Sequence, residues 1–131
     1  MTTPLWCLVI LAIVPYLLGF LGGYFRMQQF GSIDNKHPRQ QQAKMEGVGA
    51  RAVAAHQNSW EALGFFTAAV VVLSVANPTA AHGSTAANLS LGFLATRVAH
   101  PILYLANLDI LRSTVFVVGV ACVIGLFYIA A

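Results

Sequence analysis

"RAVAAHQNSWEALGFFTAAVVVLSVA" (residues 51–76) is the stretch of sequence that decides the fold. Its second part, from Ala62 onward, has no charged residue. A helix over the whole stretch would exceed the roughly 20 residues needed to cross the hydrocarbon core of a bilayer. Its first part nevertheless carries an arginine, a histidine, an asparagine and a glutamate. The stretch therefore predicts a membrane-spanning helix whose first half holds ionisable groups.

The composition of the whole chain agrees with a membrane protein. Of its 131 residues, 58% are hydrophobic and 8% are charged, whereas a soluble domain has about 25% charged residues. Such a chain could not cover a water-facing surface. Helices are the only open-ended way to cross a bilayer, because each peptide group is then bonded within its own segment. The length suits one domain, and we predict a single all-α integral membrane domain.

Four segments are apolar and long enough to form the helices of a membrane four-helix bundle. Asn77 and Pro78 end the second segment, because proline cannot continue a helix and disfavours helix in the residue before it. A long polar loop at about 26–51 separates the first two segments. The predicted helices span about 4–25, 52–76, 89–105 and 111–130.

The basic residues predict the orientation of the chain in the membrane. All seven lie in or near the first and third loops, and the N-terminus, the middle loop and the C-terminus have none. Because cytoplasmic loops are enriched in lysine and arginine, both termini are expected on the non-cytoplasmic side. Scattered basic residues without an aromatic stacking platform do not favour nucleic-acid binding. The basic residues are Arg26, Lys36, Arg39, Lys44, Arg51, Arg97 and Arg112.

Helical periodicity places the polar residues of the second and third segments on defined faces. Arg51 and Asn58 fall within about 20° of each other and Glu61 about 60° further round, with His56 and Trp60 on nearly the opposite side. In the third segment, polar residues three and four apart share one face. These are Arg97, His100 and Tyr104.

Depth connects the two polar faces. Glu61 lies about 15 Å along its helix from Arg51, and Arg97 lies about 12 Å from the cytoplasmic end of its own helix. An unpaired charge at such depth costs about 3 kcal/mol or more. We therefore predict that Glu61 and Arg97 face the bundle interior and neutralise one another, with Asn58 and Tyr104 completing the hydrogen bonds.

The charge balance of this region points to an anionic ligand. Four arginines stand against one carboxylate, and the planar guanidinium group suits carboxylates. The alternative is an ion pair that only fixes helix register. Cys7 and Cys122 lie inside apolar runs with no clustered histidine or cysteine, so the chain carries no metal-site signature.

Three motifs resemble those of one known family. "AHQNSWE" (residues 55–61) is similar to the AHxNxxE core of the MAPEG family, the membrane-associated proteins in eicosanoid and glutathione metabolism. "YFRM" (24–27) is similar to its first-helix arginine site, and "RVAHPILYL" (97–105) to its RxxHxxxY stretch. Arg112 follows at nearly the family spacing. The resemblance covers all four predicted helices in order.

The resemblance implies a left-handed four-helix protomer assembled as a homotrimer in a bacterial inner membrane, with glutathione as co-substrate. A lipophilic small molecule would reach the site from the membrane lipids. Arg112 would be the catalytic residue that stabilises the glutathione thiolate, and the reaction would be a transferase or peroxidase reaction without a metal. The glutathione-binding residues implied by the resemblance are Arg26, Arg51, His56, Asn58, Glu61, Arg97, His100 and Tyr104.

The sequence departs from the family pattern at three positions. Ala54 stands where many active relatives have arginine, Ala62 where eicosanoid-forming members have tyrosine, and His100 where some of those enzymes carry tyrosine. The sequence therefore leaves two functions open. One is a glutathione-dependent enzyme, and the other is a non-catalytic membrane protein that binds a lipid, an anionic metabolite or a partner. A transporter is disfavoured because inverted repeats and broken helices are missing.

Overall fold

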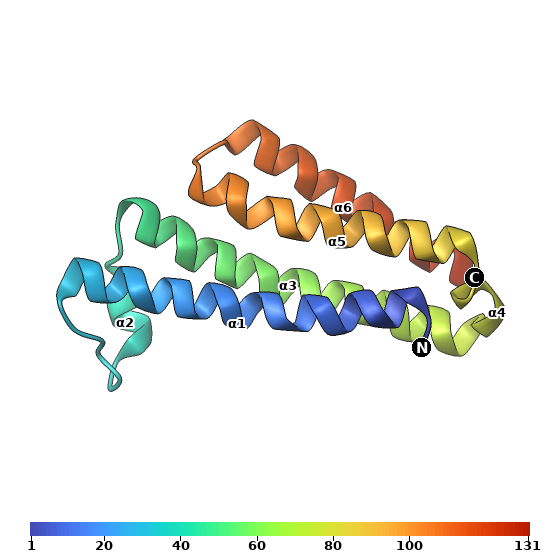
Figure 1. Cartoon of the computed structure of the whole chain (residues 1–131), viewed down its shortest axis with the longest axis horizontal. Coiled ribbons are helices and arrows are strands. Elements are labelled where there is room, and N and C mark those ends of the chain that lie inside the picture. Colours follow the sequence, from blue (N-terminus) through green and yellow to red (C-terminus); the bar gives the residue numbers. More distant parts are fainter.

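A computed structural model describes residues 1–131 and contains four long helices and two short ones, with no strand (Figure 1). The prediction of an all-helical chain is confirmed. The helices extend beyond the predicted segments, so that the loop between the first two long helices is shorter than residues 26–51. The long helices are α1 (Thr3–Phe30), α3 (Gly47–Ala76), α5 (Ser84–Leu105) and α6 (Asp109–Ala130), and the short ones are α2 (Pro38–Ala43) and α4 (Pro78–Ala81).

Local sequence explains where the helices end. Gly31 has a φ of 72° and its N–H donates to the carbonyl of Met27 at 2.9 Å, which closes the last turn of α1. Glycine suits this left-handed position because it has no Cβ. Asn77 ends α3, and its side-chain oxygen accepts a hydrogen bond from the Ala80 amide at 3.1 Å, which caps α4. The chain thus turns sharply between α3 and α5.

Three helices, α1, α3 and α6, are long and apolar enough to cross a membrane. α5 matches α6 in length, with 22 residues each, but carries more polar side chains. These are turned inward, since Ser90, Arg97 and His100 are buried, whereas Leu91 and Ile102 are exposed. An inward polar face and an outward apolar face are what a helix within a bilayer requires. The chain is an integral membrane protein.

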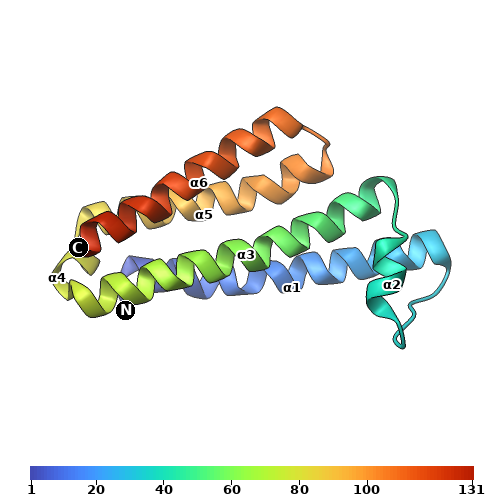
Figure 2. The same ribbon diagram turned by 180° about the vertical axis from the view of Figure 1, so that it is seen from behind.

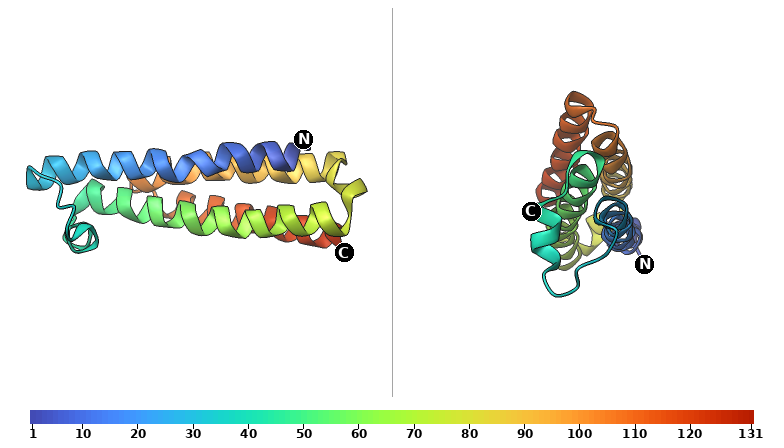
Figure 3. Two further views of the ribbon diagram at one scale, coloured as in Figure 1. Left: turned by 90° about the horizontal axis from the view of Figure 1, so that it is seen from below. Right: turned by 90° about the vertical axis from the view of Figure 1, so that its left-hand side faces the viewer.

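The four long helices alternate in direction and form two pairs, α1 with α3 and α5 with α6 (Figures 1 and 2). α3 also contacts α5 and α6, and α1 contacts α5. Both termini and α4 lie at one end of the bundle, while α2 and the α5–α6 turn lie at the other (Figure 3). Most basic residues therefore gather at the end opposite the termini.

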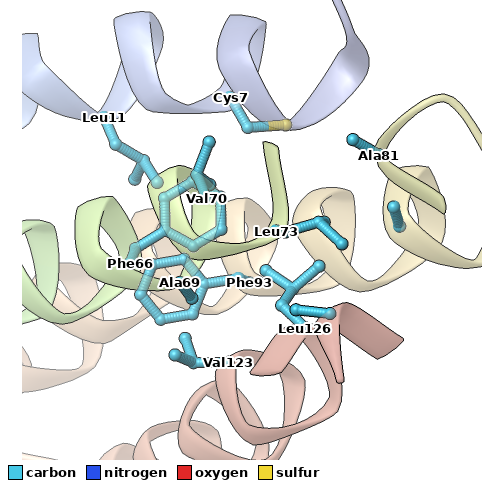
Figure 4. Packing of buried hydrophobic residues seen from close by; sticks show 12 residues of the cluster. Cys7, Leu11, Phe66, Ala69, Val70, Leu73, Ala81, Phe93, Val123 and Leu126 are labelled. Atoms are coloured by element: carbon cyan, nitrogen blue, oxygen red, sulfur yellow. The ribbon is translucent and has the colours of Figure 1, made fainter. Parts of the chain in front are cut away.

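The apolar core occupies the half of the bundle near the termini (Figure 4). The rings of Phe66 and Phe93 stack at its inner edge, with centroids 4.6 Å apart and planes 11° apart. The α5–α6 pair converges on the α1–α3 pair at this end and diverges from it toward the α5–α6 turn (Figures 1 and 2). The polar residues lie in the diverging half. The core residues are Cys7, Leu11, Phe66, Ala69, Val70, Leu73, Ala81, Ala86, Phe93, Val123, Leu126 and Ala130.

Candidate functional site

Arg97 is buried between the helices, with a side chain that is 6% exposed. Its guanidinium donates to the side-chain oxygen of Asn58 at 3.3 Å and to the carbonyl of Val115 at 3.5 Å. It also lies 5.3 Å from the ring centre of Phe93 and 5.7 Å from that of Phe116. These hydrogen bonds are long, and neutral oxygens and aromatic faces compensate the charge only in part.

The predicted ion pair between Glu61 and Arg97 is not formed, because no carboxylate oxygen lies within 4.0 Å of the guanidinium. The predicted hydrogen bond with Asn58 is confirmed, since its side-chain oxygen accepts from Arg97. The reason is the face of the helix: Asn58 is turned toward α5, whereas Glu61, about 60° further round α3, is exposed. Tyr104 does not bond to Arg97 either. Glu61 nevertheless borders the same cavity as Arg97.

Gly119 makes room for Arg97 on the facing helix. A Cβ at this position would lie 2.8 Å from the Thr96 hydroxyl oxygen and 2.9 Å from Nη2 of Arg97. Both approaches are shorter than the contacts that real Cβ atoms make. A glycine on α6 is therefore what allows the guanidinium to pass between α5 and α6.

Two adjoining cavities open between α3 and the α5–α6 pair, and we call them together the α3–α6 groove. The deeper cavity has a volume of about 270 Å³ and the other about 250 Å³. Asn58 and Phe116 border both. The deeper one is lined by Asn58, Glu61, Ala62, Phe65, Phe93, Arg97, Phe116 and Val120, and the other by Asn58, His100, Tyr104, Arg112, Ser113, Phe116 and Val117.

Arg112 is the cation of the second cavity. Its guanidinium carbon lies 4.2 Å from the ring centre of Tyr104, which holds the side chain in a fixed position by a cation–π contact. The Tyr104 ring in turn meets the ring of His100 edge-on, with centroids 5.6 Å apart. No carboxylate pairs with Arg112. Its donors therefore remain free for an anion in the cavity.

Arg51 sets the register between α3 and α5. Its Nε donates to the carbonyl of Leu105 at 3.2 Å, which brings the start of α3 level with the end of α5. From this bond, Asn58 lies about 10 Å along α3 and Arg97 about 12 Å along α5. The two side chains thus reach the same depth, which explains their contact.

Arg26 does not join the groove. It is 7% exposed, and its guanidinium donates to the side-chain oxygen of Gln41 at 2.8 Å and to the carbonyl of Asp34 at 3.1 Å. These bonds fix the loop that carries α2 against the end of α1. Within this chain, Arg26 holds the loop in place rather than lining the groove.

The Asp34 carboxylate organises the same loop. It accepts the backbone amides of Lys36 at 2.8 Å and His37 at 3.0 Å. The bond from the His37 amide, followed by that from Lys36, holds the pKa of the Asp34 carboxyl below its ordinary value. The ionised Asp34 side chain therefore stabilises this turn.

His56 also lies away from the groove, as its position on the helix predicted. Its Nε2 accepts a hydrogen bond from Nε1 of Trp60 at 3.0 Å. The Trp60 ring meets the ring of Tyr16 on α1 edge-on, with centroids 5.4 Å apart. Of the nine residues implied by the resemblance, the groove brings together Asn58, Glu61, Arg97, His100, Tyr104 and Arg112, with Arg51 at its rim and Arg26 and His56 elsewhere.

Sequence reasoning missed the apolar walls of the groove. Phe65 follows Glu61 by one helical turn and Phe93 precedes Arg97 by one turn, so helical spacing from the polar residues could have found these two. Phe116 and Val120 belong to an apolar helix in which no residue stands out. Gly119 has no signal in the sequence either.

The match to known families covers nearly the whole chain. Residues 3–131 match the model of the MAPEG family. No curated protein and no solved structure matches the chain significantly. The family match and the four-helix architecture agree with each other, and the polar groove lies among the residues that carry the family motifs. The chain belongs to the MAPEG family of membrane proteins of glutathione and eicosanoid metabolism.

Proposed function

We propose that the protein is a glutathione-dependent transferase or peroxidase that acts on lipophilic electrophiles or lipid hydroperoxides. The observation that carries this proposal is Arg112, a guanidinium held on the Tyr104 ring with no acidic partner and bordering a cavity within a membrane domain. A thiol has a pKa near 8.5 and reacts as the thiolate. A neighbouring guanidinium lowers that pKa and raises the reactive fraction at neutral pH.

The groove supplies the other parts that such a reaction needs. Arg51, Arg97 and Asn58 offer donors to the carboxylates of the tripeptide. Glu61, which has no partner within the chain, offers an acceptor to its amine. Phe65, Phe93, Phe116 and Val120 give the deeper cavity an apolar wall for a lipophilic co-substrate.

In the transferase reaction, Arg112 would hold the thiolate while its sulfur attacks the electrophilic carbon. A carbon–sulfur bond forms, and the leaving group departs with its electron pair. In the peroxidase reaction, the sulfur attacks a hydroperoxide oxygen, and a second glutathione completes the disulfide as the alcohol and water leave. Neither reaction requires a metal.

We further propose a homotrimer in which the groove faces a neighbouring protomer, with the basic end of the bundle in the cytoplasm of a bacterial cell. Two features support this arrangement. The exposed carboxylate of Glu61 lies halfway along a membrane-spanning helix. A neighbouring protomer would shield this charge from the lipid. The basic residues lie at one end of the bundle, as the positive-inside rule requires of a cytoplasmic face.

The test is thiolate formation by purified protein. On mixing with glutathione, we expect an ultraviolet thiolate band, followed by conjugation of a chloronitrobenzene. Replacing Arg112 with alanine should remove the band and slow turnover by roughly 10²-fold or more, the scale expected when one charge-stabilising donor is lost. Lys44→Ala removes a charge from the same end of the bundle but outside the groove. It should leave the thiolate band and the turnover unchanged.

The same experiment separates the enzyme from a non-catalytic binding protein. Glutathione that raises the melting temperature without a thiolate band or turnover would reject the enzyme and favour the binding protein. The departures at Ala54 and Ala62 from the family pattern would then have removed the chemistry.

A further inference from the structure

A small cavity lies inside the bundle between α1, α3 and α5, and we call it the inner cavity. Its volume is about 10 Å³, which is the space that one water molecule needs. Asn58 and His100 border both the inner cavity and the α3–α6 groove. Leu11 and Val14 of α1, which does not line the groove, border the inner cavity as well. The inner cavity therefore lies behind the wall of the groove.

Two prolines leave backbone carbonyls without helical partners beside the inner cavity. Pro15 lies inside α1 and Pro101 inside α5. Because proline has no N–H, the hydrogen bond to the carbonyl four residues earlier cannot form. The affected carbonyls belong to Leu11 and Arg97, and both residues line the inner cavity. In a membrane helix such a carbonyl needs another donor, and ordered water is one of the groups that can supply it.

Both carbonyls lie on the inward faces of their helices. Pro15 is fully buried, and Pro101 itself lines the inner cavity. The carbonyl that each proline frees lies one turn before the proline ring, on the same side of the helix. No side chain of the bundle donates to either carbonyl. The inner cavity is thus the place where the two acceptors can share a donor.

The side chains around the inner cavity supply donors. His100 is 5% exposed and makes no hydrogen bond within the chain. Asn58 uses its side-chain oxygen to accept from Arg97 and leaves its amide N–H groups without a partner. Ser59 donates to the carbonyl of His56 at 2.6 Å, so its hydroxyl can only accept. Buried polar groups without a hydrogen bond are destabilising.

From this geometry we infer that the inner cavity binds one ordered water molecule. The water donates its two hydrogens to the carbonyls of Leu11 and Arg97 and accepts from the side chains of Asn58 and His100. Buried waters make roughly two to four hydrogen bonds, whereas apolar cavities stay dry. The water joins the two proline-containing helices, and it holds Asn58 and His100 from the side that faces away from the groove.

The test measures nuclear Overhauser transfer from water to alanine methyl groups of the protein in detergent micelles. Ala55 and Ala69 are matched reporters, because both lie on α3 and are at most 1% exposed. Ala55 lines the inner cavity, whereas Ala69 belongs to the apolar core. We expect a cross-peak between water and the Ala55 methyl group and none for Ala69. A missing cross-peak at Ala55, or equal cross-peaks at both, would overturn the inference.

Ser59→Ala is the control for chemical exchange, because the Ser59 hydroxyl proton exchanges with solvent and lies at the same cavity. The Ala55 cross-peak should persist in this variant. Its loss would assign the signal to the hydroxyl group and overturn the inference. This comparison and that of Ala55 with Ala69 leave both prolines in place, so they decide the matter even if a proline variant does not fold.

Replacing the prolines tests which groups hold the water. Pro15→Ala and Pro101→Ala each return an N–H to the freed carbonyl, so each should lower the Ala55 cross-peak roughly fivefold, the effect of losing one hydrogen bond. Pro4→Ala is the matched control, since Pro4 lies in the first turn of α1 and frees no carbonyl. It should leave the cross-peak unchanged. An unchanged cross-peak in both test variants, or an equal fall in the control, would refute the assignment of the two carbonyls.

Discussion

At the scale of single residues, the groove depends on how the charge of Arg97 is compensated. The sequence predicted the burial of this side chain, which follows from its depth in a membrane helix. Its ionic partner Glu61 was predicted wrongly, while the predicted hydrogen bond with Asn58 is confirmed, because helical angles alone do not say which of two nearby polar groups faces the neighbouring helix. Asn58 faces it and Glu61 does not.

The contact between Asn58 and Arg97 gives a first prediction. Asn58→Leu, which keeps the volume, should destabilise the protein by about 1–2 kcal/mol, because the buried guanidinium loses the shorter of its two side-chain hydrogen bonds and keeps only that to Thr96. The double variant Asn58→Leu/Arg97→Met should regain part of this loss, since no charge is left unpaired. Thermal unfolding in detergent gives the coupling free energy. Strictly additive effects would show that the contact is not stabilising.

A second prediction concerns Gly119. Alanine at this position should displace the Thr96 or Arg97 side chain and destabilise the protein by roughly 1–3 kcal/mol, as overpacking does. Gly22→Ala is the control, because a Cβ there meets nothing within 4 Å and alanine favours a helix by up to about 1 kcal/mol. If both variants melted at or above the wild-type temperature, Gly119 would not be the residue that gives Arg97 its room.

At the scale of elements, the sequence predicted the long helices well and their connections poorly. Apolar length identifies the long helices, because a bilayer demands it. The extension of α1 to Phe30 and the start of α3 at Gly47 depend on contacts across the loop. Gln29 illustrates this: its side chain donates to the Lys44 carbonyl at 3.2 Å and accepts the Glu46 amide at 3.1 Å.

The third prediction follows from the Asp34 turn. Because folding lowers the pKa of this carboxyl, its stabilising effect is present above the ordinary carboxyl pKa of about 4 and is lost as the pH falls through the lowered value. Hydrogen exchange at the Lys36 and His37 amides should therefore show greater opening of the loop in acid than the intrinsic pH dependence explains. Asp34→Asn should open the loop at neutral pH as well, and unchanged protection in that variant would contradict the assignment.

At the scale of the whole molecule, the alternation of the helices brings the first and third loops to one end of the bundle and both termini to the other. The sequence predicted this separation from the distribution of its basic residues. The bundle also has a large exposed apolar surface, on which Phe20 and Tyr128 are about four-fifths exposed. Such a surface agrees with a chain surrounded by lipid.

The fourth prediction tests the orientation. Ser32→Cys introduces a thiol in the loop after α1, and Ser84→Cys introduces one at the first residue of α5, at the end that holds the termini. A membrane-impermeant maleimide added to intact bacterial cells should label the Ser84 variant alone, and disruption of the cells should expose the Ser32 variant. Cys7 and Cys122 lie inside the helices, so the unmodified protein is the background. The reverse labelling pattern would invert the topology.

The sequence by itself determined the class of the protein, the long helices, the separation of charge and the faces on which the polar residues lie. Each of these follows from a local physical rule, either the thickness of the bilayer or the period of the helix. Only the tertiary structure decided that Arg97 bonds to Asn58 without an ion pair to Glu61, that Arg26 fixes the loop, and that His56 shares a cavity with Arg39. These contacts join residues far apart in the chain, and their geometry depends on the register between helices, which no single helix specifies.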